Sequence, residues 1–592
     1  MEPQSAPLRE HLGNWAPAGL YLAIFFLLNP HLLSTLSTHY WFGGADGYQN
    51  IWNLWWVNHV LTESGGNPWF TQFLHHPGGT TLLGHTLNPF NGLLAIILLP
   101  FFSMVEAYNL IVVFSFVAGG VTAFWLCRAM TGSYAGSVVG GAVFTFSSYH
   151  YMHGDGHLQL TALEWLPLFV LCWIRYGERP TMARGLGAAA VLWLVALCDL
   201  YYFAYCVFAG AMFYLWQARR VRDWFFLFRP ATAPAAIAFL LPASLTCGVL
   251  VAALVYQHAT DPLTGTHSPR DLSMDLLSPF VWGYYWRFRD QVQPLWFPLA
   301  KYVTEASVYV GISVIALSVY AWRQRARVPV AHLGFWMILA GFFFVMSLGP
   351  NLRVAGFELS LGPRVSMMGY DEVNLLVLPY AVLWLVFPPW RLAGVPVRMM
   401  IMVQLVAAIM AAGGVQALMQ SSWRWRRAAM ALALAWLVFD YLPVPTRLTS
   451  PAMPPYVAAL RDLPDGAVLD LASNGPLALF YQTEHEKPIA FGYISRTPTS
   501  VDATDQALAG MILRGEWDRL TAEHGFTYVV KRTRAADVMV RGLNEQPVPD
   551  IDEARRIYLD DGVAIYRFSS LGGVSPEQFE ADHVRLRRKG VH

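Results

Sequence analysis

One carboxylate stands out near the N-terminus, in the stretch THYWFGGADGYQNIWNLWWVNHV. Asp46 has glycines close by on both sides and is the only acidic residue between Glu10 and Glu63. A carboxylate in such a position can deprotonate a hydroxyl group or hold a divalent cation. The simpler alternative is a solvated turn or a helix cap. The Trp- and Asn-rich residues that follow predict an amphipathic helix lying along a membrane surface.

Imidazole groups gather in a second segment, SSYHYMHGDGHLQLTALEWLPL, which carries His150, His153, Asp155 and His157. Imidazole and carboxylate side chains together suit a transition metal such as Zn or Mn. His153 and His157 have the four-residue spacing of helical zinc motifs, but the glycines between them favour a turn. Asp155 is therefore a metal ligand, a functional partner of Asp46 or His157, or a local cap.

Arginines and further ionisable residues lie near the ends of apolar segments. Arg391 and Arg398 in PPWRLAGVPVR present guanidinium forks, which match phosphate oxygens. Their alternative role is to anchor the chain to anionic lipid or to pair with nearby acids. Ionisable groups at membrane depth are functional candidates, and His85, Asp199 and Glu305 are predicted to line one cavity. Asp199 could equally be an N-cap, and Glu305 could stabilise the first turn of a helix.

The composition indicates which elements position these residues. The chain has 592 residues, of which 55% are hydrophobic and 13% are charged, whereas soluble proteins carry roughly 25% charged residues. The sequence therefore predicts a membrane protein. A net charge of +1 gives no reason to expect nucleic acid as a partner. The five cysteines lie in or beside apolar runs without a C-x-x-C pair, which indicates packing residues.

A bilayer core about 30 Å thick needs roughly 20 apolar residues per helix. On this basis we expect an α-helical polytopic protein with about eleven transmembrane helices. The expected spans centre on 15–34, 107–127, 135–149, 160–176, 185–199, 202–217, 232–256, 304–322, 331–348, 399–418 and 428–443.

Arginine clusters in short loops predict the orientation, because basic loops stay in the cytoplasm. The clusters lie at 175–184, 219–222, 323–327 and 424–427. All four lie on one side of the membrane if the spans alternate and if the apolar segments 92–104 and 374–389 do not cross it. The first apolar run lacks a cleavage site and is predicted to be a span. We therefore expect a multi-pass inner (plasma) membrane protein with a cytoplasmic N-terminus and its long loops outside.

The chain is predicted to divide into a membrane module, residues 1–445, and a soluble extracytoplasmic domain, residues 446–592. The second part is richer in charged residues and follows a Pro-rich stretch. Its strand-like runs AVLDLA, FTYVVKR and VAIYRF alternate with helix-like stretches, which predicts a small α/β domain. It contains no phosphate loop, G-x-S-x-G or H-E-x-x-H motif.

An acid in the first external loop, followed by Gly-Tyr-Gln and a Trp-rich helix, resembles the GT-C superfamily of membrane glycosyltransferases. The segments HHPGGTTLLGHTLNPFNGLL, EWLPL, PPWRLAGVPVRMM and YQTEHEKPIAFGYISR are similar to the YfhO-type bacterial members of that superfamily. The resemblance implies transfer of a sugar from a polyprenyl-phosphate carrier to an external glycan, lipid or protein acceptor, with inversion.

The resemblance also implies roles for individual residues. Asp46 and Asp155 would be catalytic, and the donor phosphate would be bound by Arg391, Arg398, His85, His157, Glu305 and Asp199. A divalent cation, Mg or Mn, would be held by Asp46, Asp155 and His157 in a metal-dependent member. Two other classes stay open: a transporter or flippase for a lipid-linked saccharide, and a scaffold without activity. Transporters typically show repeated halves, which this sequence lacks.

Overall fold

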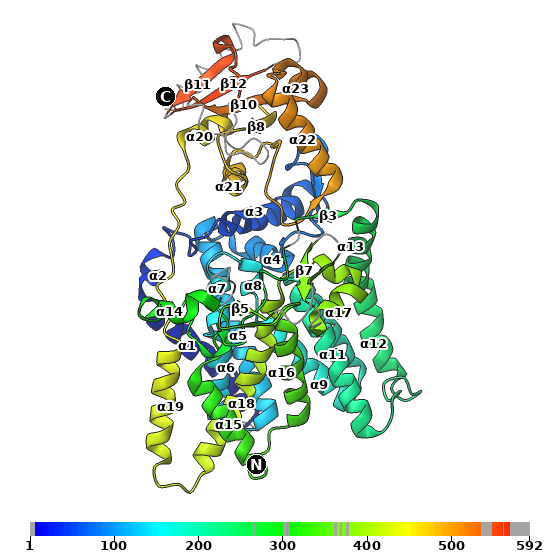
Figure 1. Ribbon diagram of the computed structural model, residues 1–592, viewed down its shortest axis with the longest axis vertical. Helices are drawn as coiled ribbons and strands as arrows, with labels where there is room; N and C mark the ends of the chain where they lie inside the picture. The colour runs from blue at the N-terminus through cyan, green and yellow to red at the C-terminus, as the bar shows by residue number, and fades with distance from the viewer. Residues whose placement is uncertain are drawn as a thin grey trace. The chain divides into compact units, whose positions relative to one another are not determined.

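The computed structural model describes residues 6–265, 267–299, 305, 307–359, 364–367, 370–374, 378–392, 394–533, 548–560 and 562–568. The chain divides into two compact units (Figure 1). Unit 1 comprises Met1–Ser37, Asn109–Val251 and Thr266–Leu448, and unit 2 comprises Thr38–Tyr108, Ala252–Gly265 and Thr449–His592. The predicted boundary at 445–446 lies close to one of these boundaries. The loop 35–106, predicted to be external, lies mostly in the same unit as Thr449–His592.

The described part of unit 1 is helical and includes two short hairpins. Its helices are α1 (Ala6–Leu28), α2 (Pro30–Thr35), α6 (Tyr134–Thr145), α7 (Ser148–Gly154), α8 (Leu158–Thr161), α9 (Trp165–Glu178), α10 (Met182–Cys198), α11 (Leu200–Val221), α12 (Ala233–Ala243), α14 (Gln293–Trp296), α15 (Ile312–Gln324), α16 (Leu333–Ser347), α17 (Pro379–Val386), α18 (Met400–Gln420) and α19 (Arg426–Asp440). Helices α5 (Met104–Thr131) and α13 (Val249–Thr260) run across unit boundaries. The hairpins are β4 (Arg353–Val354) with β5 (Phe357–Glu358), and β6 (Arg364–Met367) with β7 (Tyr370–Asn374).

Each of the predicted spans overlaps a helix. In the described part of the chain, three helical stretches are long and apolar enough to cross a membrane: Met104–Thr131, Ala233–Thr260 and Pro396–Gln420. Others, such as Tyr134–Thr145 and Leu333–Ser347, are apolar but shorter. The positions of the apolar helices are therefore as predicted, whereas the count of eleven crossings is not confirmed.

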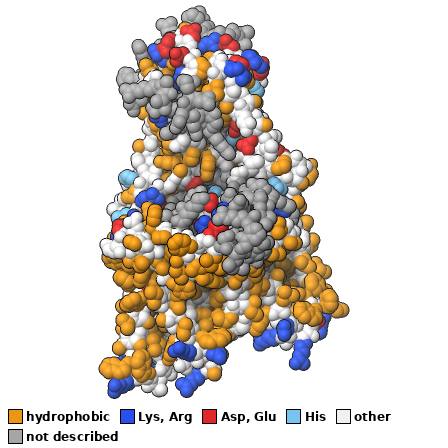
Figure 2. All heavy atoms as spheres, in the orientation of Figure 1, with side chains coloured by type: hydrophobic (Ala, Val, Ile, Leu, Met, Phe, Trp, Pro, Cys, Tyr) orange, Lys and Arg blue, Asp and Glu red, His pale blue; other side chains and the backbone are white. Residues whose placement is uncertain are grey.

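The surface of the helical body is consistent with a membrane environment. Figure 2 shows hydrophobic side chains covering its flank and Lys and Arg side chains gathered at the lower end. The arginine clusters after α11, after α15 and before α19 are all exposed. This arrangement fits apolar contact with lipid and basic contact with headgroups and water. The side on which this end lies stays a prediction.

Helix α18 is largely buried, and α6, α15, α16 and α19 pack against it. Small residues allow the helix backbones to approach closely. A Cβ atom on Gly414 would lie 2.3 Å from the carbonyl oxygen of Leu317 in α15. The apolar segments 92–104 and 374–389, predicted not to cross, overlap only short helices in their described residues: α4 (Pro89–Leu98) and α17.

Unit 2 is an α/β unit. Its elements are α3 (Asp46–His59), β1 (Phe70–Thr71), β2 (Thr80–Thr81), α4, β3 (Leu263–Thr264), α20 (Pro455–Asp462), β8 (Ala467–Asp470), α21 (Gly475–His485), β9 (Thr497–Pro498), α22 (Thr499–Leu513), α23 (Trp517–His524), β10 (Phe526–Arg532), β11 (Arg556–Asp560) and β12 (Val563–Arg567). The main sheet has the order β11-β12-β10-β8, in which β8 and β10 are parallel and the other pairs antiparallel. All three predicted strand-like runs form strands of this sheet.

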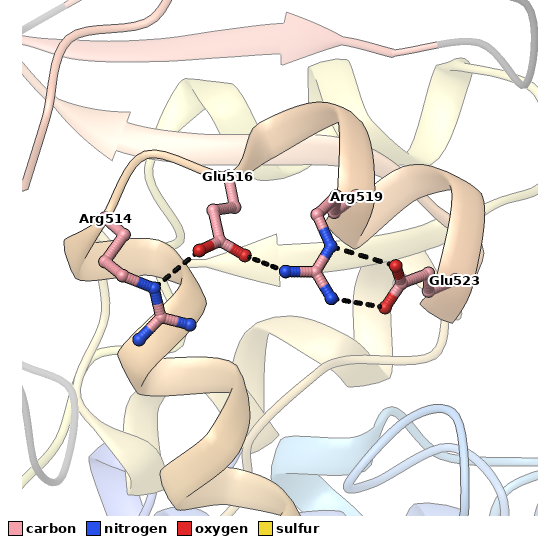
Figure 3. Close-up of polar contacts among 4 residues, drawn as sticks. All are labelled: Arg514, Glu516, Arg519 and Glu523. Atoms are coloured by element: carbon pink, nitrogen blue, oxygen red, sulfur yellow. Dashed lines mark hydrogen bonds and ion pairs between the residues drawn. The ribbon is translucent and has the colours of Figure 1, made fainter.

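Successive residues of a strand point to opposite faces of the sheet, and here both faces are buried. On one face, Val468 and Val530 join a core shared with α20, α21 and the tryptophans of α3. On the other face, Leu469 and Val529 pack with α22 and α23. Outside these cores, Arg514, Glu516, Arg519 and Glu523 form an exposed chain of ion pairs between α22 and α23 (Figure 3).

Helix α3 differs from the prediction. Its residues from Gly47 to Val57 are almost all buried, and the helix packs against α4 and α21. Trp52 donates its indole N–H to Gln482 Oε1 of α21 at 2.7 Å. The prediction of an amphipathic helix on a membrane surface was wrong, because the asparagines and glutamine on its polar face are buried within the protein.

Candidate functional site

Asp46 is the first residue of α3 and is half-buried. The positive end of the helix dipole favours the ionised form of a carboxylate at this position. Gly47 is required beside it, because a Cβ atom there would lie 2.1 Å from the ring of Phe42. The local sequence Ala-Asp-Gly thus presents a carboxylate on a turn that the surrounding side chains hold tightly.

A buried polar network lies one turn further along α3. Gln49 donates to the Thr86 hydroxyl at 2.9 Å, and Asn53 donates to the Thr86 carbonyl oxygen at 2.8 Å. His85 contacts both side chains, and its Nδ1 accepts the backbone N–H of Ser495 at 3.1 Å. Two segments that are distant from α3 in the sequence therefore fix the helix that carries Asp46.

The network fixes the state of His85. Nδ1 accepts from Ser495, and Nε2 lies 3.0 Å from Asn53 Oδ1, where it can donate. An imidazole ring in which one nitrogen accepts and the other donates is neutral. Burial lowers the pKa of His85 to about 3, although the negative charge of Asp46 acts in the opposite direction. His85, predicted to bind substrate, is a buried neutral support for α3.

Asp155, in unit 1, terminates α7. Its Oδ2 accepts from Arg447 Nη2 at 2.6 Å and Nε at 3.2 Å, and from the Tyr285 hydroxyl at 3.1 Å. The Asp155 side chain is 6% exposed and that of Arg447 is 52% exposed. The structure thus pairs this acid with an arginine from the segment after α19. The predicted pairing of Asp155 with Asp46 or His157 stays a prediction.

Glu305 and Arg398 form a two-point ion pair with both side chains nearly buried. Burial raises the pKa of Glu305, but the guanidinium group of Arg398 outweighs this effect and holds it well below its usual range. Arg398 also lies 5.2 Å from the ring centre of Tyr201. Glu305 is not in the first turn of a helix, because α15 begins only at Ile312.

Asp199 and Arg391 have structural partners. Asp199 is the N-cap of α11 and accepts the backbone N–H groups of Tyr201 at 2.7 Å and Tyr202 at 3.3 Å. Arg391 donates to the carbonyl oxygens of Trp384 and Leu385, both at 3.3 Å, at the end of α17. Asp199 therefore acts as a helix cap, which was one of its two expected roles. Arg391 donates hydrogen bonds to carbonyl groups in the last turn of a short helix. Their predicted roles in binding stay predictions.

The histidines of the second segment differ sharply in their surroundings. His150 is fully buried, with its ring nitrogens 2.8 and 2.9 Å from the carbonyl oxygens of Thr145 and Thr161. His153 is equally buried, yet neither of its ring nitrogens has a hydrogen-bond partner among the described residues. Its ring lies between those of Tyr149 and His157, with centres 4.4 and 5.4 Å away. His153 also interacts electrostatically with Glu305 and Arg398.

The predicted divalent cation is not confirmed by the described part of the chain. Within the described ranges, no three His, Cys, Asp or Glu side chains are grouped so that they could hold a metal ion. Asp155 and Glu305 each accept hydrogen bonds from an arginine instead. Asp46 belongs to unit 2, whereas Asp155 and His157 belong to unit 1.

Sequence reasoning missed Arg447, Ser495 and the special position of His153. Arg447 carried a usable signal, because it is a basic residue on the side predicted to be external, like Arg398. Ser495 contributes a backbone group, which no side-chain pattern can reveal.

Residues 17–367 match a family described as "Domain of unknown function (DUF6311)". The chain belongs to this family. The matched part of the DUF6311 protein contains Asp46, Asp155 and Glu305, and it ends before Arg398, Arg447 and Ser495. No curated protein matches the DUF6311 chain.

Two solved structures resemble the DUF6311 protein in part. The archaeal oligosaccharyltransferase AglB from Archaeoglobus fulgidus, in complex with an inhibitory peptide and a dolichol-phosphate, has a TM-score of 0.47 and 10% identity over 88% of this chain and 69% of that chain. ArnT from Cupriavidus metallidurans, bound to undecaprenyl phosphate, has a TM-score of 0.46 and 10% identity over 94% of this chain and 98% of that chain. Scores of this size carry no functional conclusion.

Proposed function

We propose that this DUF6311 protein is a membrane glycosyltransferase of the GT-C type. It transfers a sugar from a polyprenyl-phosphate carrier to an extracytoplasmic acceptor, with inversion at the anomeric carbon and with Asp46 as the base. The observation that carries the proposal is the placement of Asp46, on the first turn of a buried helix held by a network from two distant segments. A catalytic group needs this kind of rigid support.

The chemistry requires a base and a stabilised leaving group. An acceptor hydroxyl attacks the anomeric carbon, its proton passes to the carboxylate of Asp46, and the bond from the sugar to the phosphate oxygen breaks. The helix dipole favours the ionised form of a carboxylate at the position of Asp46, and this is the form that accepts a proton.

The departing phosphate gains negative charge and needs cationic partners. Arg398 is our candidate, because its guanidinium group is nearly buried, where electrostatic interactions are stronger than in water. Both guanidinium groups already have partners, Glu305 for Arg398 and the end of α17 for Arg391. Arg391 is the weaker candidate, because it is only half-buried. Asp155 and His157 remain proposed contributors to substrate binding in unit 1.

The test is release of free polyprenyl phosphate by the purified protein from a lipid extract that contains polyprenyl-phosphate sugars, measured by mass spectrometry. Asp46→Asn should lose at least a hundredfold in rate, the usual contribution of a general base, while its thermal unfolding is unchanged. Asp290→Asn is the matched control, because the Asp290 side chain is 86% exposed and should be dispensable.

An assay with the same lipids distinguishes a glycosyltransferase from a flippase. A flippase moves labelled lipid across a proteoliposome membrane without releasing polyprenyl phosphate, and Asp46→Asn need not change that movement. Lipid movement without release would contradict the proposed function.

A further inference from the structure

Helix α4 has one buried face and one exposed face. Gly92 and Ala95 are buried, and a Cβ atom on Gly92 would lie 2.4 Å from the side chain of Val57 in α3. The opposite face carries Leu93 and Ile97, which are 41% and 64% exposed. Residues four positions apart lie on the same side of a helix. Helix α4 therefore packs on α3 with one face and presents large apolar side chains on the other.

The turn after α4 extends this exposed apolar face. Phe101 and Phe102 are 81% and 41% exposed, and their backbone N–H groups donate to the carbonyl oxygen of Leu98. No charged residue occurs in residues 86–105. Apolar surface of this kind is unfavourable in water and marks a contact with lipid or with protein.

The beginning of α5 indicates that the contact is with lipid. Helix α5 is one of the stretches that are long and apolar enough to cross a membrane. The Glu106 carboxylate in its first turn accepts the backbone N–H and the hydroxyl group of Ser103, at 2.9 and 2.8 Å. A charged group is costly inside the hydrocarbon core, so where α5 crosses, this polar turn belongs at the membrane boundary. Phe101 lies within about 7 Å of Ser103, because two residues of chain reach no further.

We propose that α4 is a membrane anchor of unit 2, lying along the lipid surface with Leu93, Ile97 and Phe101 in contact with acyl chains. With its 10 residues α4 is about 15 Å long, half of what crossing the hydrocarbon core requires. The helix on the membrane surface that was expected at α3 is therefore α4. Because α4 packs on α3, the anchor also holds the helix of Asp46 close to a carrier in the membrane. This last consequence rests on the proposed function, whereas the anchoring does not.

The experiment is electron paramagnetic resonance of the full-length protein in proteoliposomes, with a spin label on Ile97→Cys or, separately, on Phe101→Cys. The same labelling of the protein without an engineered cysteine measures the background from its native cysteines. Collisions of the label with oxygen, which concentrates in lipid, should exceed collisions with a water-soluble nickel chelate. Asp465→Cys is the control and should show the reverse order, because the Asp465 side chain is fully exposed in the same unit.

Two results would overturn the proposal. Labels at positions 97 and 101 that the nickel chelate reaches as readily as the label at position 465 would show that this face lies in water. Labels shielded from both reagents, with dipolar broadening that disappears on dilution with unlabelled protein, would show that a second copy of the chain covers the face.

Activity tests the consequence for Asp46 separately. A double variant, Ile97→Ser with Phe101→Ser, should unfold in detergent like the wild type, because both side chains are exposed. In proteoliposomes it should release polyprenyl phosphate roughly tenfold more slowly, the loss expected when burial of one apolar side chain is removed. With the same lipids dissolved in detergent, where no membrane surface positions the donor, its rate should equal that of the wild type. Leu559→Ser is the matched control, since Leu559 is 47% exposed in β11.

The two measurements fail in different ways. Equal loss of rate in proteoliposomes and in detergent would contradict the consequence for Asp46. Wild-type protein that releases no polyprenyl phosphate would contradict the proposed function, and the collision measurement would still decide whether α4 is a membrane anchor.

Discussion

At the scale of single residues, the sequence identifies chemically relevant side chains but not their partners. Asp46, Glu305 and Arg398 are conspicuous because charge is rare in apolar surroundings. Their partners could not be inferred from spacing. Glu305 and Arg398 are 93 positions apart, and Asp155 and Arg447 are 292 positions apart. His153 was grouped with possible metal ligands, and only the structure shows that its ring nitrogens lack partners among the described residues, while those of His150 lie within hydrogen-bond distance of carbonyl oxygens.

The neutral state of His85 leads to a prediction about pH. Burial lowers the pKa of His85 to about 3, below its ordinary value of 6.5. The unfolded chain therefore binds more protons between these pH values, so the free energy of unfolding must fall as the pH drops below about 6.5. Each such histidine contributes a slope of about 1.4 kcal/mol per pH unit.

His85→Gln removes one titratable group, so the free energy of unfolding of the variant should depend less on pH. The measurement is thermal unfolding of the protein and its variant between neutral and mildly acidic pH. The variant should lose less stability than the wild type on acidification, even if it is less stable at neutral pH. His485 keeps a similar contribution, because its pKa is also lowered to about 3. Identical pH slopes would show that His85 is not held neutral.

At the scale of elements, apolar patterns predicted the positions of the apolar helices well. Long apolar runs have few alternatives to helices. The core of a membrane offers no hydrogen-bond partners, so the backbone groups must bond to one another within the chain. The Trp-rich helix α3 was misjudged, because its polar side chains are buried against other parts of unit 2 rather than facing water. A polar helix face indicates a partner for hydrogen bonds, and it does not reveal whether that partner is water or protein.

Close packing of α18 against α15 predicts a large effect of one added methyl group. A Cβ atom at Gly414 would lie 2.3 Å from a backbone oxygen of Leu317, which cannot move aside cheaply. Gly414→Ala should therefore destabilise the protein by about 1–3 kcal/mol.

Gly187 in α10 is the matched control, since a Cβ atom there meets nothing within 4 Å. Gly187→Ala should leave stability unchanged or raise it slightly, because alanine favours helix formation. Thermal unfolding in detergent measures both variants. Equal effects at the two positions would contradict the close contact between α15 and α18.

At the scale of the whole molecule, the division into residues 1–445 and 446–592 stays a prediction, and it rests on the change in composition. No local pattern in the sequence indicates that Thr38–Tyr108 joins Thr449–His592 in one compact unit. Trp52, Trp55 and Trp56 of α3 share a hydrophobic core with residues of α20, α21, β8 and β10. Such a core depends on contacts between segments about 400 positions apart, as between Trp52 and Gln482.

This shared core predicts that the C-terminal segment is not an independent domain. A fragment comprising Thr449–His592 alone should expose the sheet face that α3 covers, and it should aggregate or lack fixed tertiary structure. Amide NMR dispersion and size-exclusion chromatography measure this outcome. A well-dispersed spectrum from a monomeric fragment would show that the domain folds without α3.

The proposed role of Asp46 is that of the base in sugar transfer from a phosphorylated carrier. The stoichiometry of turnover in proteoliposomes tests this role, with polyprenyl phosphate released and sugar gained by the acceptor fraction counted together. We expect one carrier released for each sugar transferred, and loss of both products in Asp46→Asn. Carrier release or sugar transfer that continues unchanged in that variant would contradict it.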